Sequence, residues 1–526
     1  MSSFAPAVNR LSDIYGADEN AQALRYARLV VTFKATYGSQ PEFIARAPGR
    51  VNIIGEHIDY CGFPVFPMAI APDTLVAARA NGSDRIRVSN MDGTKYPPRD
   101  FSVAEMFEID STKHEWSNYF KCGYRGVLDH VSRQGDKGFD ALIDGQVPAG
   151  GGLSSSAAFV CATQLAVQRI EGLSLTQAEL ASAAAQAERH VGVNAGGMDQ
   201  AVSIMGQQDS ALFIEFHPAL KATPVRLPEA DLPFAFVIAN TLVVSNKHTT
   251  APTNYNLRVV ETRVGALMLT KHLGIAEHVV CASAHPLTFK VVMDEYFAKP
   301  NVGDINDDGV QGWVERLETM LRETEKAFGT HPHGYTRDEM AAALSITATD
   351  LSAKIHEDQF PVRADRFKIL QRAQHAFSEA LRVVKFRGIC EQAPENAGLR
   401  LGDLMNQSQD SCRDLFECSC PELDEICKIA RQAGSFGSRL TGAGWGGCSV
   451  HLVPANKVDD VKKALAEQYY AVCFPDLSAE QLSEALFATK PGRGPSALVW
   501  RQPGGHAFRP AIAAIVTAKG SGAKNV

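Results

Sequence analysis

The feature that most constrains this 526-residue chain is a run of three glycines followed, one residue later, by three serines. The glycines occupy 150–152 and the serines 154–156. Glycine has no Cβ, so the backbone N–H groups of such a run can converge on an anion. The apolar segment 157–167 indicates a helix whose first turn begins at the serines, and the segment 139–147 indicates a preceding strand. A strand, a glycine turn and a helix N-terminus predict a phosphate-binding loop, and the alternative is a surface turn that caps a helix.

Two commoner phosphate-binding patterns do not match this stretch. No lysine precedes the hydroxyls, and no G-x-G-x-x-G run is followed by an acidic residue about 20 positions later. The net charge of −7 offers no basic surface to nucleic acid or to an anionic membrane. Any bound phosphate must therefore be held by local groups.

The length of the chain predicts two or three domains. Its N-terminus has no basic segment followed by an apolar one, and no apolar run reaches about 18 residues, so we expect a cytoplasmic protein. The eleven cysteines lie mostly among apolar residues and are expected to be reduced thiols. A denser group leaves a zinc site as an alternative: Cys412, Cys418, Cys420 and Cys427.

A second informative stretch, 43–62, gathers four polar side chains among apolar residues. They are Arg50, Glu56, His57 and Asp59, and a turn is predicted at Pro48-Gly49 between two strand-like runs. Buried charges need partners, and a ligand rich in hydroxyls would supply them. The alternatives are an internal ion-pair cluster, such as Arg50 with Glu56, or a metal site at His57 and Asp59.

A third stretch, 186–200, follows an alanine-rich helix that is expected to begin near Thr176. It turns at Gly196-Gly197 and is expected to present Asp199 from a turn. On residue types alone, Asp199 is equally compatible with a solvated carboxylate.

Three motifs together resemble one superfamily. Residues 49–60 (GRVNIIGEHIDY) are similar to the galactokinase signature, and residues 151–157 (GGLSSSA) to the phosphate loop of the galacto-, homoserine, mevalonate and phosphomevalonate (GHMP) kinases. Residues 437–448 are similar to the C-terminal glycine motif of that superfamily. The resemblance spans most of 20–495 and is closest to the eukaryotic branch, which includes fungal galactokinases and N-acetylgalactosamine kinases.

The resemblance implies an α+β fold of two domains with the active site in the cleft between them. We expect an N-terminal domain over 1–240 and a C-terminal domain over 241–500, with a helical insertion at about 279–365. The tail 501–526 has no counterpart and is expected to be disordered or particular to this protein.

The resemblance also implies the roles of site residues. Asp199 would abstract or orient the proton of the sugar hydroxyl, and Arg50 would contact both the γ-phosphate and Asp199. The residues expected to contact the sugar are Arg50, Glu56, His57, Asp59, Gly196, Asp199 and Tyr255. Those expected to contact ATP are Trp116, Gly150, Gly151, Gly152, Leu153, Ser154, Ser155, Ser156 and Ala157. Ser155 or Ser156 would hold Mg²⁺ together with Glu188, and Trp116 is also compatible with a plain core position.

The implied activity is ATP-dependent phosphorylation of α-D-galactose at O1, the first committed step of galactose catabolism. An N-acetylgalactosamine kinase is the alternative, and Tyr255 favours galactose. An alternative of another class is a galactose- and ATP-responsive sensor that binds a transcriptional repressor. Such sensors lack two residues after the serines of the loop, whereas 156–158 are complete here, so we expect catalysis to be intact.

Overall fold

The computed structural model describes residues 4–16, 19–113, 115–191, 196–228, 233–243, 250–276, 287–299, 302, 309–355 and 361–499. The predicted tail at 501–526 lies outside these residues. Within them, no helix combines the length and the apolar character that crossing a membrane requires.

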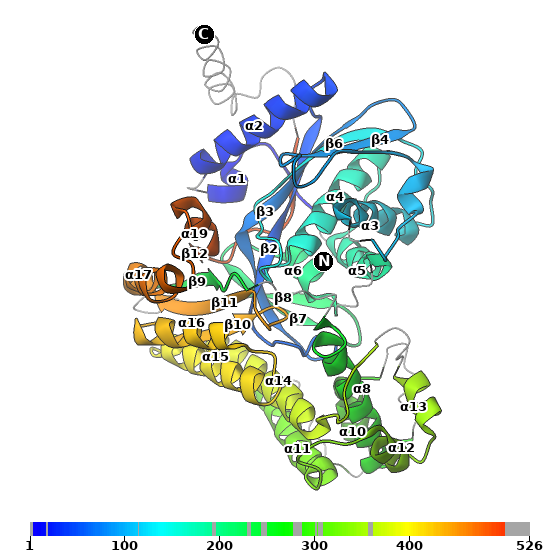
Figure 1. The fold of residues 1–526 in the computed structure, drawn as a ribbon, viewed down its shortest axis with the longest axis vertical. Helices are drawn as coiled ribbons and strands as arrows, with labels where there is room; N and C mark the ends of the chain where they lie inside the picture. The colour runs from blue at the N-terminus through cyan, green and yellow to red at the C-terminus, as the bar shows by residue number, and fades with distance from the viewer. Residues whose placement is uncertain are drawn as a thin grey trace.

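A seven-stranded mixed sheet forms the first layer, with strand order β1-β13-β2-β3-β6-β4-β5 (Figure 1). The last described strand, β13, pairs antiparallel with β2 and parallel with β1, so the first and last described strands lie in the same sheet. The strands are β1 (Ala7–Val8), β2 (Phe43–Ile54), β3 (Phe66–Ala80), β4 (Arg85–Asn90), β5 (Arg99–Ser102), β6 (Phe139–Gly145) and β13 (Ser496–Val499).

The prediction of a turn at Pro48-Gly49 is wrong, because β2 runs through it without a break. All twelve residues of β2 are buried, and the register shifts between Pro48 and Arg50 at a bulge. A bulge tolerates the missing N–H of a proline. A Cβ on Gly49 would lie 2.9 Å from the carbonyl oxygen of Leu153, so the strand can approach the phosphate loop only with glycine here.

Helices cover both faces of this sheet (Figure 1). One face carries α3 (Trp116–His130), α4 (Ser155–Glu171) and α5 (Gln177–Ala187), whose apolar residues share a core with β2, β3 and β6. The other face carries α1 (Ser12–Tyr15) and α2 (Glu19–Tyr37). The predicted order of strand, glycine turn and helix is confirmed by β6 and α4, and α5 begins after a capping box made by Thr176 and Glu179.

A four-stranded antiparallel sheet, β10-β11-β9-β12, forms a second layer with α16 (Pro421–Gln432) and α17 (Val458–Leu465). Its strands are β9 (Phe234–Asn240), β10 (Gly437–Thr441), β11 (Cys448–Pro454) and β12 (Leu486–Thr489). Because β9 pairs with β11 and β12, it already belongs to the second sheet. The boundary expected at 240 therefore follows, rather than precedes, the first strand of that sheet, and β13 crosses back into the first.

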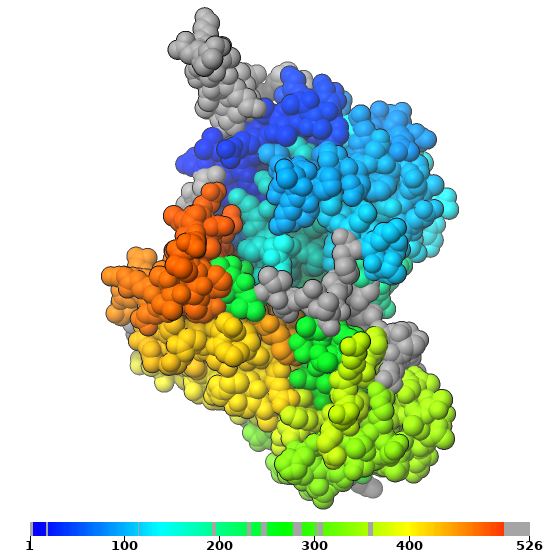
Figure 2. Space-filling view, in the orientation of Figure 1, coloured from blue at the N-terminus to red at the C-terminus, as the bar shows by residue number. Residues whose placement is uncertain are grey.

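The remaining part is helical and lies beside the second sheet (Figures 1 and 2). The long helices α14 (Ile369–Gln392) and α15 (Ala397–Asp414) pack against each other, and α8 (Tyr255–His272) packs against α14. The segment expected to be an insertion contains α10 (Phe289–Phe297), α11 (Val310–Phe328), α12 (Arg337–Leu344) and α13 (Ala348–Lys354). The remaining elements are the hairpin β7 (Ser210–Glu215) and β8 (Lys221–Arg226), with α6 (Met198–Met205), α18 (Ala471–Cys473) and α19 (Ala479–Ala485).

Candidate active site

The glycine and serine loop enters α4 through three residues with left-handed backbone. Gly150, Gly152 and Ser154 have φ values of 75°, 73° and 59°, and α4 begins at Ser155. The Ser154 side chain makes no capping hydrogen bond to the helix. The first-turn N–H groups of α4 have no partner within the helix, so this N-terminus can accept an anion.

The glycine-rich loop between β10 and β11 packs directly behind the phosphate loop. A Cβ built on Gly152 would lie 3.0 Å from the carbonyl oxygen of Thr441, and one on Gly151 would lie 3.4 Å from Sγ of Cys448. The two loops belong to different sheets. The phosphate loop is therefore shaped by contacts that only the assembled fold provides.

Arg50 joins the phosphate loop to Asp199. Its Nη1 donates to the carbonyl oxygen of Gly152 at 2.6 Å, and its Nε donates to Oδ1 of Asp199 at 2.7 Å. The Arg50 side chain is 5% exposed and that of Asp199 is 25% exposed. The Arg50 guanidinium is thus held by the phosphate loop, while the Asp199 carboxylate remains partly exposed to solvent.

Asp199 is helical and lies near the N-terminus of α6, whereas we expected it in a turn. Gly197 caps this helix with a φ of 97°. Its neighbour Gly196 lies so close to Asp59 that a Cβ there would collide with Oδ2 of the Asp59 carboxylate. Burial, and then the charge of Asp199, raises the pKa of Asp59 to about 6. The charge of Asp199 therefore acts on the Asp59 carboxylate, against which Gly196 packs.

Glu188 is the C-cap residue of α5. It begins a short 3₁₀ segment, Glu188–Val191, and is buried. Burial raises the pKa of the Cys161 thiol in α4, and the charges of Glu188 and Asp199 add to that effect. Both carboxylates therefore lie near the N-terminal half of α4, to which Ser155 and Ser156 contribute hydroxyls. These are oxygen donors, which suit Mg²⁺.

His57 is neutral, because burial lowers its pKa to about 3. Its Nε2–H donates to the carbonyl oxygen of Ala443 at 3.0 Å, so its Nδ1 accepts from the Tyr60 hydroxyl at 2.9 Å. Both ring nitrogens are thus occupied by protein groups. His57 links the signature turn to the glycine-rich loop instead of pointing a free nitrogen at a ligand.

Glu56 also has protein partners. Its carboxylate lies 2.8 Å from Nη1 of Arg439 and accepts from the backbone N–H of Gly442 at 3.0 Å. The ion-pair cluster considered from sequence therefore exists with other pairings, because Arg50 pairs with Asp199 and Glu56 with Arg439. Arg439 was not among the expected site residues, although it lies inside the quoted glycine motif. The available signal was that Arg439 is the only charged residue of that motif.

Tyr255, the first residue of α8, closes this group. Its ring centroid lies 5.7 Å from that of His57 and 5.8 Å from that of Tyr60. Burial raises the pKa of Tyr255 well above its usual value, and the negative charges of Asp59 and Asp199 raise it further. Tyr255 therefore lies near the same pair of carboxylates.

Trp116, the first residue of α3, packs against α4. Its ring stacks on Phe159 of α4 with centroids 6.2 Å apart, and its Nε1–H donates to the carbonyl oxygen of Pro97 at 3.2 Å. The indole is partly buried and lies one turn beyond the start of α4. Its contacts agree with the core alternative, and its exposed edge leaves the adenine contact as a prediction.

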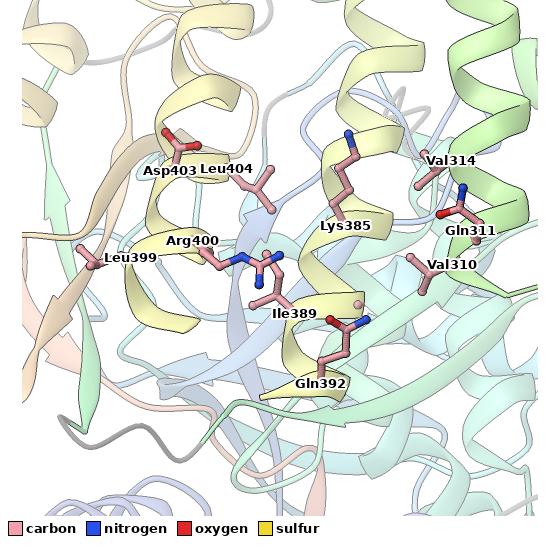
Figure 3. Close-up of a pocket in the computed structure, with 11 residues that line it drawn as sticks. Val310, Gln311, Val314, Lys385, Ile389, Gln392, Leu399, Arg400, Asp403 and Leu404 are labelled. Atoms are coloured by element: carbon pink, nitrogen blue, oxygen red, sulfur yellow. The ribbon is translucent and has the colours of Figure 1, made fainter. Parts of the chain in front are cut away.

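A cavity of about 500 Å³ lies elsewhere, between α11, α14 and α15 (Figure 3). None of the expected site residues lines it, so we do not assign the site to it. Its lining residues are Val310, Gln311, Val314, Lys385, Gly388, Ile389, Gln392, Leu399, Arg400, Asp403 and Leu404.

Three sequence families match consecutive parts of the chain. Residues 31–80 match the galactokinase galactose-binding signature, residues 118–207 the N-terminal domain of GHMP kinases, and residues 390–471 the C-terminal part of GHMP kinases. These segments contain the signature stretch, the phosphate loop with Asp199, and the glycine-rich loop.

Curated relatives match over most of their length. The chain is 40% identical over 493 residues to a galactokinase of Saccharomyces cerevisiae, covering 89% of this chain and 93% of the relative. It is 40% identical over 522 residues to a galactokinase of Dictyostelium discoideum, covering 94% and 98%.

Solved structures share the fold. The chain is similar to Lactococcus lactis galactokinase complexed with galactose, with a TM-score of 0.63, 24% identity, and coverage of 90% of this chain and 99% of that one. It is also similar to Methanococcus jannaschii mevalonate kinase, with a TM-score of 0.51, 18% identity, and coverage of 86% and 99%. The two-domain α+β fold of GHMP kinases is therefore confirmed.

Proposed function

Because the chain belongs to the galactokinase family of the GHMP kinases, we propose that it transfers the terminal phosphoryl group of ATP to O1 of α-D-galactose. The observation that carries the proposal is the position of Arg50, which bonds to Asp199 and to the phosphate loop at the same time. A base and a phosphate-binding loop joined by one guanidinium suit an in-line transfer between a hydroxyl and a phosphate.

The phosphate loop would bind the phosphates of ATP through backbone N–H groups of residues 150–157. Phosphoryl transfer needs little covalent help, and its main requirements are alignment and cancellation of negative charge. The N-terminus of α4 and the guanidinium of Arg50 supply that positive potential without moving during the reaction.

Asp199 would accept the proton of the O1 hydroxyl as the bond from O1 to the γ-phosphorus forms. The bond between the γ-phosphorus and the bridging oxygen breaks, and ADP leaves with that electron pair. The anomeric hydroxyl is the most acidic on the sugar, so a carboxylate held in place by Arg50 is an adequate base.

Asp59, Gly196 and Tyr255 would frame the sugar. Gly196 packs against Asp59, and the charges of Asp59 and Asp199 both act on the Tyr255 hydroxyl. Glu56 and His57 remain proposed sugar contacts, but each would have to share a polar atom that a protein group already engages. Their present partners support a second role, holding Tyr60 and the loop 442–447 in place.

Ser155, Ser156 and Glu188 would hold Mg²⁺ next to the phosphates. When bound, the ion supplies further neutralisation of phosphate charge. ATP as co-substrate follows from membership of a kinase family. Binding of a transcriptional repressor stays a prediction from the resemblance.

The test is ADP release by the purified protein with ATP, Mg²⁺ and one of four sugars: galactose, N-acetylgalactosamine, glucose or mannose. We expect kcat/KM to be highest for galactose, by at least tenfold over the others, and the product to be galactose 1-phosphate. A higher kcat/KM for N-acetylgalactosamine would favour the alternative kinase. No sugar-dependent ADP release from a folded sample would contradict the proposal.

A further inference from the structure

The signature turn that follows β2 has an unusual backbone. Gly55 and His57 have φ values of 107° and 61°, so two of three consecutive residues are left-handed. For His57, which has a Cβ, this conformation is strained and persists only if the surroundings enforce it. The turn matters because it sets the direction of His57, and through His57 that of Tyr60.

Two buried side chains of α14 grip this turn. Oε1 of Glu379 accepts from the backbone N–H of Gly55 at 2.9 Å and from that of Glu56 at 3.3 Å. Nε2 of His375 lies 3.1 Å from the carbonyl oxygen of Glu56. His375 and Glu379 are four residues apart, so they lie on one face of the helix and bind the two ends of the same residue.

The protonation state of His375 is fixed by its partners. Burial lowers its pKa to about 4, so the ring is neutral. Because a carbonyl oxygen only accepts, Nε2–H must donate to Glu56, and Nδ1 must accept from the Ser411 hydroxyl at 2.8 Å. The donor to the turn is therefore oriented by α15.

Glu379 is held in a similar way. It accepts from the Ser408 hydroxyl at 2.6 Å and from Nε of Arg382 at 2.7 Å. Burial opposes its ionisation, but Arg382 and Arg439 outweigh that effect and keep the pKa of the carboxyl below its usual value. His375 and Glu379 are both fully buried, so neither is available to a substrate.

We propose that His375 and Glu379 are positioning residues for the sugar substrate, and that they act by clamping the backbone of Gly55 and Glu56 in the conformation that presents the sugar-binding side chains. This inference rests on the proposed function for its substrate. Both residues lie outside the three segments matched by sequence families, which end at 207 and resume at 390. The clamp thus extends the site to a helix that no motif marked.

The test compares His375→Leu, which removes the donor to Glu56, with His375→Gln, whose amide N–H can replace it. Ile389→Ala is the control, because Ile389 is buried on the same helix but lies ten residues beyond Glu379. For each variant we would measure the melting temperature, kcat and KM for galactose, the Kd of ATP without sugar, and amide hydrogen exchange of residues 50–60.

We expect His375→Leu to lower kcat/KM for galactose at least tenfold and to speed exchange at residues 55–57, with the Kd of ATP within twofold of wild type. His375→Gln should recover kcat/KM to within threefold. The kcat/KM of Ile389→Ala for galactose should stay within threefold of wild type, even if its melting temperature falls as much as that of His375→Leu. An equal loss of kcat/KM in Ile389→Ala, or unchanged exchange and kcat/KM in His375→Leu, would overturn the inference.

If His375→Leu does not fold, Ser411→Ala provides the second variant, because it removes the hydroxyl that orients the His375 ring. Faster exchange at residues 55–57 and a rise of at least threefold in the KM for galactose are expected, and no change in either would overturn the inference. Inactivity of the wild-type protein towards galactose would contradict the proposed function alone, since hydrogen exchange tests the clamp without any substrate.

Discussion

Arg50 makes the most informative contacts of any single residue in the site. One guanidinium bonds to a carbonyl oxygen of the phosphate loop and to the carboxylate of Asp199, which it reaches from a different element. Its planar fork allows both bonds at once, and an ammonium group does not offer that geometry. The alignment of base and phosphate therefore depends on the shape of this side chain as well as its charge.

We accordingly expect Arg50→Lys to lower kcat about 100-fold or more, because lysine keeps the charge but cannot hold both partners. The Kd of ATP should change by less than about fivefold, since the loop backbone and α4 remain. Steady-state kinetics and calorimetric titration with ATP measure the two quantities. A lysine variant that retains half of the wild-type kcat would show that charge alone suffices.

The Asp59 carboxylate is expected to lower the stability of the fold at neutral pH, although it is proposed to contact the sugar. Its pKa is raised to about 6 by burial and by Asp199, so the folded state binds a proton between about pH 4 and 6 that the unfolded state has lost. Stability from this group is therefore present at low pH and is lost as the pH rises through 6. Above pH 6 the charged carboxylate destabilises the fold by at most about 3 kcal/mol, less the screening that its partial exposure allows.

Asp59→Asn should therefore raise the melting temperature at pH 7.5 while weakening galactose binding, and the gain should shrink at pH 4.5. Thermal unfolding at the two pH values, alongside the KM for galactose, tests this. A variant that is less stable than wild type at pH 7.5 would contradict the sign of the effect.

At the scale of elements, the phosphate loop and the glycine-rich loop depend on each other. Gly152 has a φ of 73° and lies where a Cβ would be 3.0 Å from the carbonyl oxygen of Thr441. Gly172, at the other end of α4, has a φ of 70° but no atom within 4 Å of an added Cβ. Both glycines need a left-handed backbone, and of the two only Gly152 also lacks room for a Cβ.

Gly152→Ala and Gly172→Ala should each cost about 1–2 kcal/mol of stability, because alanine is strained in the left-handed region. Gly152→Ala should in addition raise the Kd of ATP at least tenfold, since the added Cβ displaces the loop from Thr441. Chemical denaturation and ATP titration of both variants separate the two effects. Equal ATP affinity in both would mean that the contact between the loops does not shape the phosphate site.

The elements also show what the sequence could predict. Local patterns were sufficient for α4, α5 and β6, because each has an apolar run bounded by glycines or by its own cap. They failed at Pro48-Gly49, where burial of the whole of β2 outweighed local turn preference. They also could not pair Glu56 with Arg439 or place Glu379 under Gly55, because those partners lie more than 300 residues away in the chain. Motifs thus supplied the candidate site residues, while the orientations of their side chains required the fold.

On the scale of the whole molecule, the last described strand, β13, joins segments that lie far apart in the sequence. β13 joins the first sheet, and Arg46 of β2 donates to the carbonyl oxygens of Arg493 and Gly494 just before it. Arg46 also pairs with the buried Asp73, which Arg25 of α2 contacts from the other side. Segments from both ends of the chain are therefore held in one buried charge network.

Three buried neutral histidines predict how the whole molecule responds to acid. Burial lowers the pKa of His57 and His451 to about 3 and that of His375 to about 4. The unfolded state binds these protons below about pH 6.5, so stability is complete above that pH and is lost as the pH falls. Each histidine should remove about 2 kcal/mol by pH 5, partly opposed by Asp59.

Denaturant unfolding should therefore show a free energy of unfolding that falls by several kcal/mol between pH 7.5 and pH 5. His451→Gln should reduce that fall, because it removes one titrating group outside the sugar site. A free energy that is level or rises towards pH 5 would contradict the assignment of neutral histidines.

The central claim is that the first turn of α6 brings the Asp199 carboxylate to a sugar hydroxyl aligned with the terminal phosphate of ATP. The most direct measurement is the single-turnover rate of galactose 1-phosphate formation by Asp199→Asn, with the Kd of ATP measured on the same sample. The account predicts a rate at least about 1,000-fold below wild type and an ATP Kd within about twofold. A rate within tenfold of wild type would contradict it.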